Sequence, residues 1–528
     1  MDDTRNKLKT EGLLAHLPPL RRRQFLAGAA AAAGVGALGL PRMAAAQTGN
    51  TLRISSYTNP SSMDPAIGGN GGDHVYLWNF YDPLIEWDFQ TLAPVPGLAK
   101  AWEFTDPQTL VLTLQEGVTF HDGTPFNAEA VVFNLERNRG AETSNVKPDL
   151  ATIESTEATG ELEVTIRLNK PDTALPLILS DRAGMMVSPT ALGNDPEANV
   201  NRNAVGAGPW KFVSWTDHDK VEGTRYEGYW REGLPAMDNL VMTITPERAT
   251  AMRAVQSGQS DLAYSLAETQ KTLIERLPNL KLVEGPTVYI YQLYLNRSRG
   301  PLQDARVRQA LQLAIDREAY VQATQAGVGE PARMFLPQAH WAYSQAAAEH
   351  VYFDLDRAKA LMKEAGVESG FEIDFVSYTD QAFVQRQEVV LEQLSKIGVT
   401  GTFRNGPVPD IVSRFMGAEK SGDSMLSAWT GRPDPTQSYD LLFSENSFYN
   451  PGRTPPPEGF DEALAETRAT SVQEERKAAF DKLQTIVMRE ALAITLSVRY
   501  EVNVATDKVS GFEPNLLGKP KFRDVKVG

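Results

Sequence analysis

The amino-acid sequence predicts a mixed α/β protein with two or more domains. Its 528 residues are 42% hydrophobic and 23% charged, so the composition is globular while the chain is too long for one compact core. Apolar residues alternate with polar ones in some segments and recur with a helical period in others. Both strands and amphipathic helices are therefore expected along the chain.

Strands are predicted where apolar residues occupy every second position. Leucines follow this pattern at Leu110, Leu112 and Leu114. The same alternation runs from Leu162 to Leu168, with charged or hydroxyl side chains between the apolar ones. Such segments have one buried face, and the alternation favours antiparallel pairing.

Helices are predicted where the apolar residues share one helical face. One set lies behind Asp304, a candidate N-cap, and comprises Val307, Leu311, Ile315 and Ala319. A second set, which Gly398 ends, comprises Phe383, Val390, Leu394 and Ile397. Each helix should therefore pack through a single apolar face.

An α/β unit is predicted between residues 245 and 264. Thr245 is the expected N-cap, followed by a proline in the first turn, and Gly258 is expected to close the helix before a short strand. Residues 451–459 are rich in proline and glycine, so they are expected to form a surface loop.

The first 46 residues have the features of an export signal. A basic segment precedes the apolar stretch from Leu26 to Leu40, which is too short to span a bilayer and is followed by a small-residue cleavage site at residues 44–46. Arg22 and Arg23, with the apolar residues after them, resemble a twin-arginine signal, and an ordinary secretory signal is the alternative. Either signal predicts a periplasmic protein.

Composition excludes several classes of function. The net charge of −15 argues against long contacts with nucleic acid or anionic lipid. The sequence has no cysteine, which excludes disulfides, cysteine-ligated metals, a thiol nucleophile and a lipidated cysteine. The mature protein is therefore expected to be soluble and not lipid-anchored.

Sequence motifs for catalysis and cofactor binding are absent. The chain has no nucleophile elbow, no phosphate-binding loop, no zinc-protease helix motif and no dinucleotide fingerprint. The glycine-rich run 68–72 lacks the lysine of a phosphate loop and is expected to be a flexible connection. His121 and His74 stand alone, without the spacing of a metal site. No catalytic residue, metal or cofactor is expected.

Several segments along the chain form a recognisable series: Met63 to Pro65, Tyr81 to Leu84, Gly117 to Phe126, Gly206 to Trp210, and Asp304 to Ala310. Together they resemble the peptide, nickel and opine family of solute-binding proteins from ABC importers, known as family 5. Most of these residues form turns and helix ends, so they are not expected to contact ligand.

The resemblance implies the two-lobed periplasmic binding protein fold of type II, cluster C, with an extra subdomain in the first lobe. Val288 to Asn296 would be a hinge strand at the first crossover, although its three tyrosines also suit a plain core strand. The implied division of the chain is lobe I at 47–83, 206–290 and 500–528, the inserted subdomain at 84–205, and lobe II at 291–499.

The resemblance places the ligand on the segment from Ser427 to Pro435. Peptide-binding members have an aspartate there that pairs with the ligand's α-amino group, and Arg432 occupies this position here. An arginine suits a carboxylate or phosphate instead. In the alternative, Arg432 is a scaffold residue paired with Asp434 or another acid. The candidate ligand-binding residues are Trp429, Thr430, Gly431, Arg432 and Asp434.

The implied function is that of a periplasmic receptor that delivers a peptide-like, anionic or conjugated organic solute to an ABC importer by closure of its lobes. The expected partners are the small ligand and the membrane permease, with no nucleic acid, and a monomer is expected. The alternative is a periplasmic enzyme exported by the twin-arginine pathway, which the missing motifs and cysteines disfavour.

Overall fold

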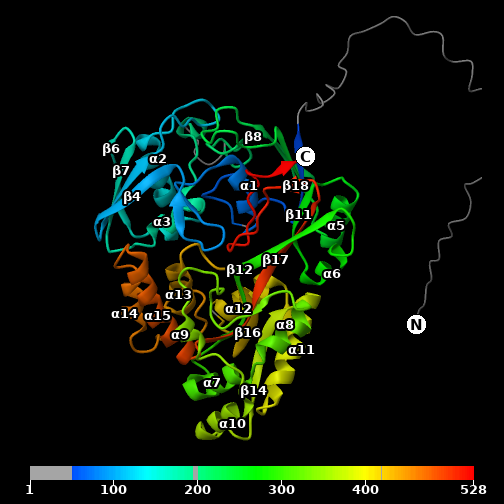
Figure 1. The fold of residues 1–528 in the computed structure, drawn as a ribbon. Helices are drawn as coiled ribbons and strands as arrows, with labels where there is room; N and C mark the ends of the chain where they lie inside the picture. Colours follow the sequence, from blue (N-terminus) through cyan, green and yellow to red (C-terminus); the bar gives the residue numbers. More distant parts are fainter. Residues whose placement is uncertain (1–49, 70, 194–199, 418) are drawn as a thin grey trace, which may run out of the picture. The chain divides into compact units, whose positions relative to one another are not determined.

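The structure is a computed structural model that describes residues 50–69, 71–193, 200–417 and 419–528 (Figure 1). The predicted export signal lies outside the described residues, as does Asn70 in the glycine-rich run. No helix within the described ranges is both long and apolar enough to cross a membrane.

One large sheet of eleven strands organises the chain. Its order is β15-β14-β16-β12-β17-β11-β1-β10-β9-β8, and β13 pairs with β17 beside this path. The strands are β1 (Thr51–Ser56), β8 (Trp210–Thr216), β9 (Lys220–Arg225), β10 (Asn239–Ile244), β11 (Leu262–Leu266), β12 (Leu280–Leu295), β13 (Glu330–Pro331), β14 (Phe371–Tyr378), β15 (Val399–Gly406), β16 (Ser424–Trp429) and β17 (Ala493–Thr506). The parallel pairs β1–β10, β1–β11, β14–β15 and β14–β16 lie on either side of the antiparallel pair β12–β17.

The long strands β12 and β17 connect the two lobes, as Figure 1 shows. They pair from Leu280 opposite Thr506 to Tyr294 opposite Ala493, but the register is interrupted between Pro286 and Ile290. A proline has no N–H to donate, so it suits a break in the ladder. The ladder between the two strands is therefore broken at this point.

The hydrophobic cores divide on the two sides of the interruption. One core of the first lobe joins β1, β10 and α1 to Val288 and the C-terminal segment. The buried residues of a second core lie within residues 84–186, apart from Ala66 and Ala207. The two largest cores of the second lobe use β12 residues from Tyr291 to Leu295 and β17 residues from Ala493 to Leu496. The same two strands therefore contribute to cores in both lobes.

The remaining strands of the described residues form three smaller sheets. The four-stranded sheet has the order β4-β5-β7-β6, and the others are the pairs β2–β3 and β18–β19. These strands are β2 (Ile85–Trp87), β3 (Pro94–Pro96), β4 (Ala99–Asp106), β5 (Thr109–Leu114), β6 (Ile153–Gly160), β7 (Glu163–Leu168), β18 (Val509–Ser510) and β19 (Lys526–Val527). The predicted strands are confirmed as β5 and β7, which pair antiparallel.

The helices of the first lobe are α1 (Asp73–Phe80), α2 (Ala128–Gly140), α3 (Leu175–Ile178), α4 (Pro189–Leu192), α5 (Arg248–Gln256) and α6 (Lys271–Ile274). Those of the second lobe are α7 (Ala305–Ala314), α8 (Arg317–Gln325), α9 (Gln345–Ala348), α10 (Leu355–Glu364), α11 (Gln381–Ser395), α12 (Val408–Met416), α13 (Pro435–Phe443), α14 (Phe460–Glu466) and α15 (Gln473–Arg489). Short 3₁₀ turns are η1 (Lys147–Leu150), η2 (Arg182–Gly184), η3 (Glu268–Gln270) and η4 (Gly300–Gln303).

The predicted helical face behind Asp304 spans two helices, not one. Ile315 has an extended conformation that ends α7, and the Asp316 side chain then accepts a hydrogen bond from the Ala319 N–H at the start of α8. The helix predicted from the second apolar set is confirmed as α11. Gly398, which lies beyond its end, has a positive φ of 81°.

The predicted N-cap of α5 was wrong. The Thr245 N–H donates to the Ser56 carbonyl at the end of β1, so this residue is fixed to the sheet before the helix begins. The cap is Glu247, whose carboxylate accepts hydrogen bonds from two N–H groups of the first turn. Gly258 closes the helix with a φ of 75°, and β11 follows, both as predicted.

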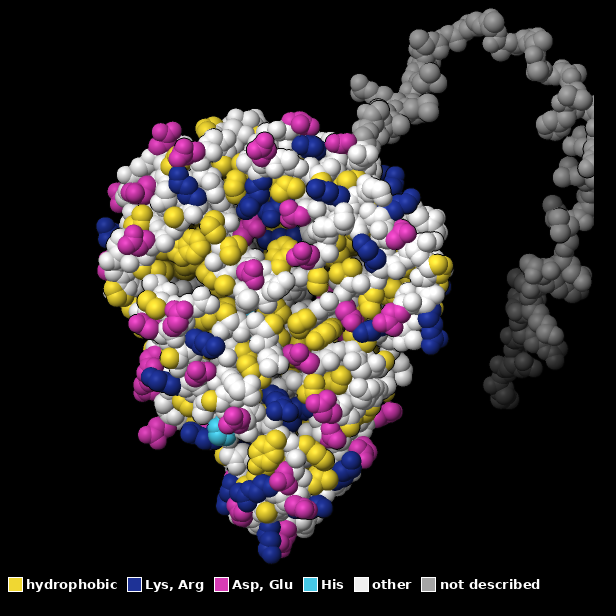
Figure 2. All heavy atoms as spheres, viewed as in Figure 1, with side chains coloured by type: hydrophobic (Ala, Val, Ile, Leu, Met, Phe, Trp, Pro, Cys, Tyr) yellow, Lys and Arg dark blue, Asp and Glu magenta, His cyan; other side chains and the backbone are white. Residues whose placement is uncertain are grey.

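The loop and turn predictions outside the helices are confirmed. Residues 451–459 contain neither helix nor strand. His121 is buried in the turn at 120–124, where its ring bonds to Gly208 O at 3.0 Å, so it supports the turn at 206–209. Basic and acidic side chains are interspersed on the face that Figure 2 shows.

Candidate ligand site between the two lobes

The candidate segment begins where β16 ends. Trp429 is the last residue of β16, pairs with Ile290 of β12, and donates from its ring N–H to Ser438 Oγ at 3.1 Å. It is buried, whereas Thr430 after it is exposed. Gly431 has a φ of +73°, and a Cβ there would lie 2.2 Å from Val288 Cγ2. Only glycine allows the chain to turn this closely past β12.

The Arg432 side chain is half-buried and lies near the Trp429 ring, with its guanidinium carbon 5.0 Å from the ring centroid. Its Nη1 donates to the carbonyl of Gly431, the preceding residue, at 2.8 Å. Among the residues that the structure describes, no carboxylate oxygen lies within 4.0 Å of its nitrogens. The guanidinium therefore retains donors that no carboxylate uses.

Asp434 has a different environment although it is only two residues away. It is fully buried, and its Oδ1 accepts from the Thr436 N–H at 2.9 Å, which caps α13. Arg476 of α15 donates to both of its oxygens, at 2.9 and 3.1 Å. The Arg476 Nε also bonds to the Thr467 carbonyl at 2.9 Å. Asp434 thus pairs with Arg476, and its bonds are used within the second lobe.

The first lobe contributes an acid that sequence analysis did not identify. Asp149 of η1 lies in the part of the first lobe next to α13, and Gln437 Nε2 of α13 donates to its Oδ1 at 3.3 Å. Burial raises the pKa of the Asp149 carboxyl to about 6, and the negative charge of Asp181 adds to the rise. Arg432 is the strongest charge acting against this rise, so it lies within the electrostatic reach of Asp149.

Asp181, whose charge acts on Asp149 from the first lobe, has two ionisable partners of its own. His74 Nε2 of α1 lies 2.6 Å from Asp181 Oδ1, and Lys519 Nζ lies 3.9 Å from Asp181 Oδ2. Burial lowers the pKa of Lys519 to about 8, and repulsion by Arg432 contributes to the lowering. Although burial alone would raise it, His74 and Lys519 hold the pKa of Asp181 well below its ordinary value. The interface is therefore rich in interacting charges.

Two backbone hydrogen bonds also cross between the lobes on this side. The Thr173 N–H, just before α3, donates to the Arg468 carbonyl after α14 at 3.2 Å. The Trp341 N–H donates to the Thr91 carbonyl at 3.3 Å. In Figure 1 the part of the first lobe that carries α3 lies beside α13 and α14, as these bonds require.

The opposite face of β12 carries a second charged cluster that joins the lobes. Arg386 Nη2 of α11 lies 3.7 Å from the Glu268 carboxylate of η3, and the Tyr291 hydroxyl lies 3.5 Å from the same carboxylate. The Arg386 guanidinium also stacks over the Tyr291 ring at 4.0 Å. Since successive strand residues point to opposite faces, Tyr291 and Ile290 point away from each other. This cluster is therefore separated from the Trp429 side by the strand itself.

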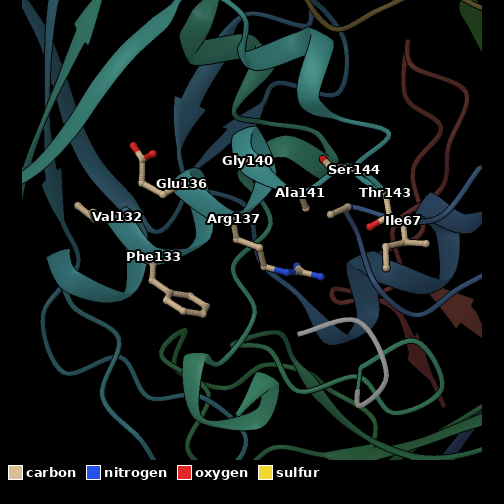
Figure 3. A pocket seen from close by; sticks show the side chains of 10 residues that line it. Ile67, Val132, Phe133, Glu136, Arg137, Gly140, Ala141, Thr143 and Ser144 are labelled. Atoms are coloured by element: carbon tan, nitrogen blue, oxygen red, sulfur yellow. The ribbon is translucent and has the colours of Figure 1, made fainter. Parts of the chain in front are cut away.

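One cavity in the described residues lies away from this interface, in the first lobe. It has a volume of about 610 Å³ and is lined by α2 and the segments around it (Figure 3). Its lining includes Phe133, Glu136 and Arg137 of α2 and Ile67 before α1. All its lining residues belong to the first lobe, so it cannot sense closure between the lobes. Within the described ranges, no group of three or more His, Cys, Asp or Glu side chains could hold a metal ion.

The comparisons with known proteins identify the family. The family model for bacterial extracellular solute-binding proteins, family 5 Middle, matches residues 93–450. The chain belongs to family 5 of the bacterial extracellular solute-binding proteins. This agrees with the resemblance found in the sequence motifs.

Family 5 relatives match over almost the whole chain. The dipeptide-binding protein of Escherichia coli is 25% identical over 522 residues, covering 92% of this chain and 96% of the relative. The glutathione-binding protein GsiB of Pectobacterium atrosepticum is 27% identical over 471 residues, covering 86% and 89%. The solved structure of HbpA2 from Haemophilus parasuis is 25% identical, with a TM-score of 0.80 over 91% of this chain and all of that one. The predicted two-lobed α/β fold is confirmed.

Proposed function

We propose that this family 5 protein is the periplasmic receptor of an ABC importer for a peptide-like or conjugated solute that carries an anionic group. The observation that supports this ligand class is Arg432, a half-buried guanidinium at the lobe interface with no carboxylate partner in the described residues. Relatives of this chain are named for dipeptide and glutathione, so a solute of peptide size suits the fold. The receptor performs no covalent chemistry.

Ligand recognition in this proposal uses the ends of β16 and α13. A carboxylate or phosphate of the ligand accepts bidentate hydrogen bonds from Arg432, whose guanidinium the Trp429 ring supports. The exposed Thr430 hydroxyl is a further possible contact, and Gly431 sets the close approach to β12. Asp434 supports the site through its bonds to Arg476 and the first turn of α13.

Transport in this proposal depends on closure of the lobes around the ligand. In this proposal lobe I and its inserted subdomain move against lobe II, residues 291–499, about β12 and β17. Ligand contacts on both lobes exist only in the closed form, so ligand shifts the population toward the form that the membrane permease recognises. The receptor acts as a monomer with the permease as its protein partner.

Delivery to the periplasm is part of the same proposal. Residues 1–46 are removed after export by the twin-arginine pathway, which leaves a mature protein without a lipid anchor. Replacing Arg22 and Arg23 by Lys should leave precursor in the cytoplasm, because the pathway reads the arginine pair as an address. Normal maturation of that double variant would assign the signal to the general secretory pathway.

Isothermal titration calorimetry on two Arg432 variants tests the ligand class. The natural ligand is first identified by mass spectrometry of the solute released from purified protein, which should be an unmodified small molecule. Truncating one partner of a buried charge pair costs about 2 to 5 kcal/mol, so Arg432→Ala should weaken binding at least tenfold and Arg432→Asp should weaken it more.

The matched control is Arg404→Ala, which removes an exposed arginine paired with Asp374 inside the second lobe. This variant should bind the ligand like the wild type. Equal affinity of all four proteins would make Arg432 a scaffold residue. Tight binding of unmodified di- or tripeptides through their amino termini would also contradict the proposed charge reversal.

A scattering measurement tests the closure mechanism independently of ligand class. The radius of gyration of the mature protein should fall when ligand saturates it, because whole lobes move. An unchanged radius at saturation would rule out closure.

A further inference from the structure

Arg432 of the second lobe lies within electrostatic reach of Asp149 of the first lobe, and the Gln437 side chain, five residues after Arg432, bonds to Asp149 at 3.3 Å. Arg432 and Asp149 form no ion pair in the described residues, since no nitrogen of Arg432 lies within 4.0 Å of an oxygen of Asp149. Arg432 is nevertheless the cation that lowers the pKa of Asp149 most strongly. The side-chain donor to Asp149 in the described residues is Gln437, at the long distance of 3.3 Å. Both charged groups therefore keep hydrogen-bonding capacity that points to a third participant.

An anion bound to Arg432 would by itself be unfavourable for Asp149. It would weaken the attraction that Arg432 exerts on this carboxylate and bring a second negative charge close to it. Asp181 already repels Asp149 from the side of the first lobe. A half-buried carboxylate that loses its counter-charge requires a hydrogen-bond donor in its place.

We propose, resting on the proposed function, that Asp149 determines specificity by accepting a hydrogen bond from an N–H group beside the ligand's carboxylate. The ligand class is then an N-acylated or N-substituted amino acid, such as the carboxyl-terminal residue of a peptide. The carboxylate binds Arg432 of the second lobe, and the N–H one carbon away binds Asp149 of the first. One amino-acid unit thus contacts both lobes.

This arrangement couples recognition to closure. Asp149 belongs to η1 of the first lobe, while Arg432 and Gln437 belong to the second. Only a ligand with both groups completes the contacts on the two sides, so it stabilises the closed form more than a simple anion does. A site built around an acceptor strongly rejects an analogue that lacks the matching donor, because the buried acceptor stays unpaired.

The test uses two tripeptides in three chemical forms each. The probes are glutathione and N-acetyl-trialanine, as the free acid, as the carboxyl-terminal amide, and as the ester analogue in which oxygen replaces the last amide N–H. Calorimetry on the wild type should show that amidation and ester replacement each weaken binding at least tenfold. The amide lacks the carboxylate that binds Arg432, so it tests the role of Arg432. The ester lacks the N–H that binds Asp149, so it tests the role of Asp149.

Two variants separate the role of Asp149 from general damage. In Asp149→Ala the ratio of peptide to ester affinity should fall to about one, while the preference for free acid over amide persists. Asp149→Asn keeps an acceptor oxygen without the charge, so its ratio should be intermediate. The matched control is Asp172→Asn, a buried carboxylate that also lies near the second lobe but is held by Thr152 Oγ1 at 2.8 Å. This variant should keep the wild-type ratio of peptide to ester affinity and the wild-type ratio of free acid to amide affinity.

The outcomes distinguish this inference from the proposed function. If the wild type distinguishes acid from amide but binds peptide and ester alike, the role of Asp149 is overturned and the Arg432 site stands. If Asp149→Ala keeps the wild-type ratio of peptide to ester, the role of Asp149 is likewise overturned. If neither free acid binds, or neither binds better than its amide, both proposals fail.

Discussion

Two arginines of the second lobe lie close to the same turn but differ in what surrounds their charge. Arg476 donates to both oxygens of the buried Asp434, and its Nε bonds to a backbone carbonyl. Arg432 bonds to the carbonyl of its neighbour, and it lies within electrostatic reach of Asp149 without an ion pair in the described residues. One arginine stabilises the scaffold, and the other keeps donors at the boundary between the lobes.

This difference shows that neighbouring residues of the segment from Ser427 to Pro435 have different roles. Asp434 stabilises the fold, and Arg432 is available for ligand recognition. The charge of Asp434 is neutralised within the second lobe, so the start of α13 does not depend on ligand. Arg432 interacts with Asp149 of the first lobe, so this interaction changes when the lobes or the ligand move. We expect mutations of Asp434 or Arg476 to reduce the stability of the fold, and mutations of Arg432 or Asp149 to change ligand binding.

The largest effect is expected for Arg476→Met, which would leave the buried Asp434 without its cation. Removing one partner of a buried pair costs about 3 to 5 kcal/mol of unfolding free energy. Urea unfolding measures this loss. The control Arg404→Met breaks the exposed pair with Asp374 and should cost about 1 kcal/mol or less.

The pairing explanation can also be contradicted by a double variant. Adding Asp434→Asn to Arg476→Met removes the unpaired charge and should restore part of the lost stability. If the double variant is less stable than Arg476→Met alone, the unpaired carboxylate is not the cause of the loss.

The next largest effect is expected for Gly431→Ala, which should reduce both the stability of the fold and the affinity for ligand. Its Cβ would lie 2.2 Å from Val288 Cγ2 and 2.9 Å from Val288 O, at a φ of +73°. Left-handed backbone in a residue with a Cβ costs about 1 to 2 kcal/mol, and the overlap adds to this. Displacement of the turn should also weaken ligand binding through Arg432. Urea unfolding and calorimetry measure the two effects.

Gly366→Ala is the matched control for the backbone conformation. Gly366 has a φ of +76°, but a Cβ there would meet nothing within 4 Å. This variant should lose only the conformational part of the stability and should bind ligand normally. Equal losses in the two alanine variants would contradict the role assigned to the contact with Val288.

The smallest effect is expected for Asp149→Asn and depends on pH. Burial raises the pKa of Asp149 to about 6, with repulsion from Asp181 and opposing attraction from Arg432 and Arg182. An acid whose folded pKa exceeds its unfolded value of about 3.9 loses stability as pH rises between the two. The ligand-free variant should therefore have a higher Tm than the wild type at pH 7. The difference should vanish below about pH 4, and a difference that persists there would contradict this cause.

The sequence alone predicted the elements that depend on local patterns. The alternation at 110–114 predicted β5, and Gly258 predicted the end of α5. The start of α5 could not be predicted, because a backbone bond from Thr245 to Ser56 of β1 decides it. The break at Ile315 was also missed, since its apolar side chain continues the helical period while its backbone is extended.

The candidate site was predictable only on one side of the interface. The motif around Trp429 pointed to Arg432 and Asp434, but the partner of Asp434 is Arg476, 42 residues further along the chain. Asp149 lies in a short 3₁₀ turn of an acidic chain, and nothing in its local sequence distinguishes it from other surface acids. Its bond to Gln437 spans 288 residues, so only the fold brings the two together.

The pairing of β12 with β17 on both sides of the interruption has a consequence for dividing the chain into fragments. Each lobe builds its sheet on strands that the other lobe also uses, so a fragment of one lobe would end in cut strands with unpaired N–H and C=O groups. Such fragments should associate or aggregate when produced alone. A two-chain version of this receptor is better opened in the loop at 451–459, which has no ladder to break. The two chains would then reassemble around an intact pair of strands, β12 and β17.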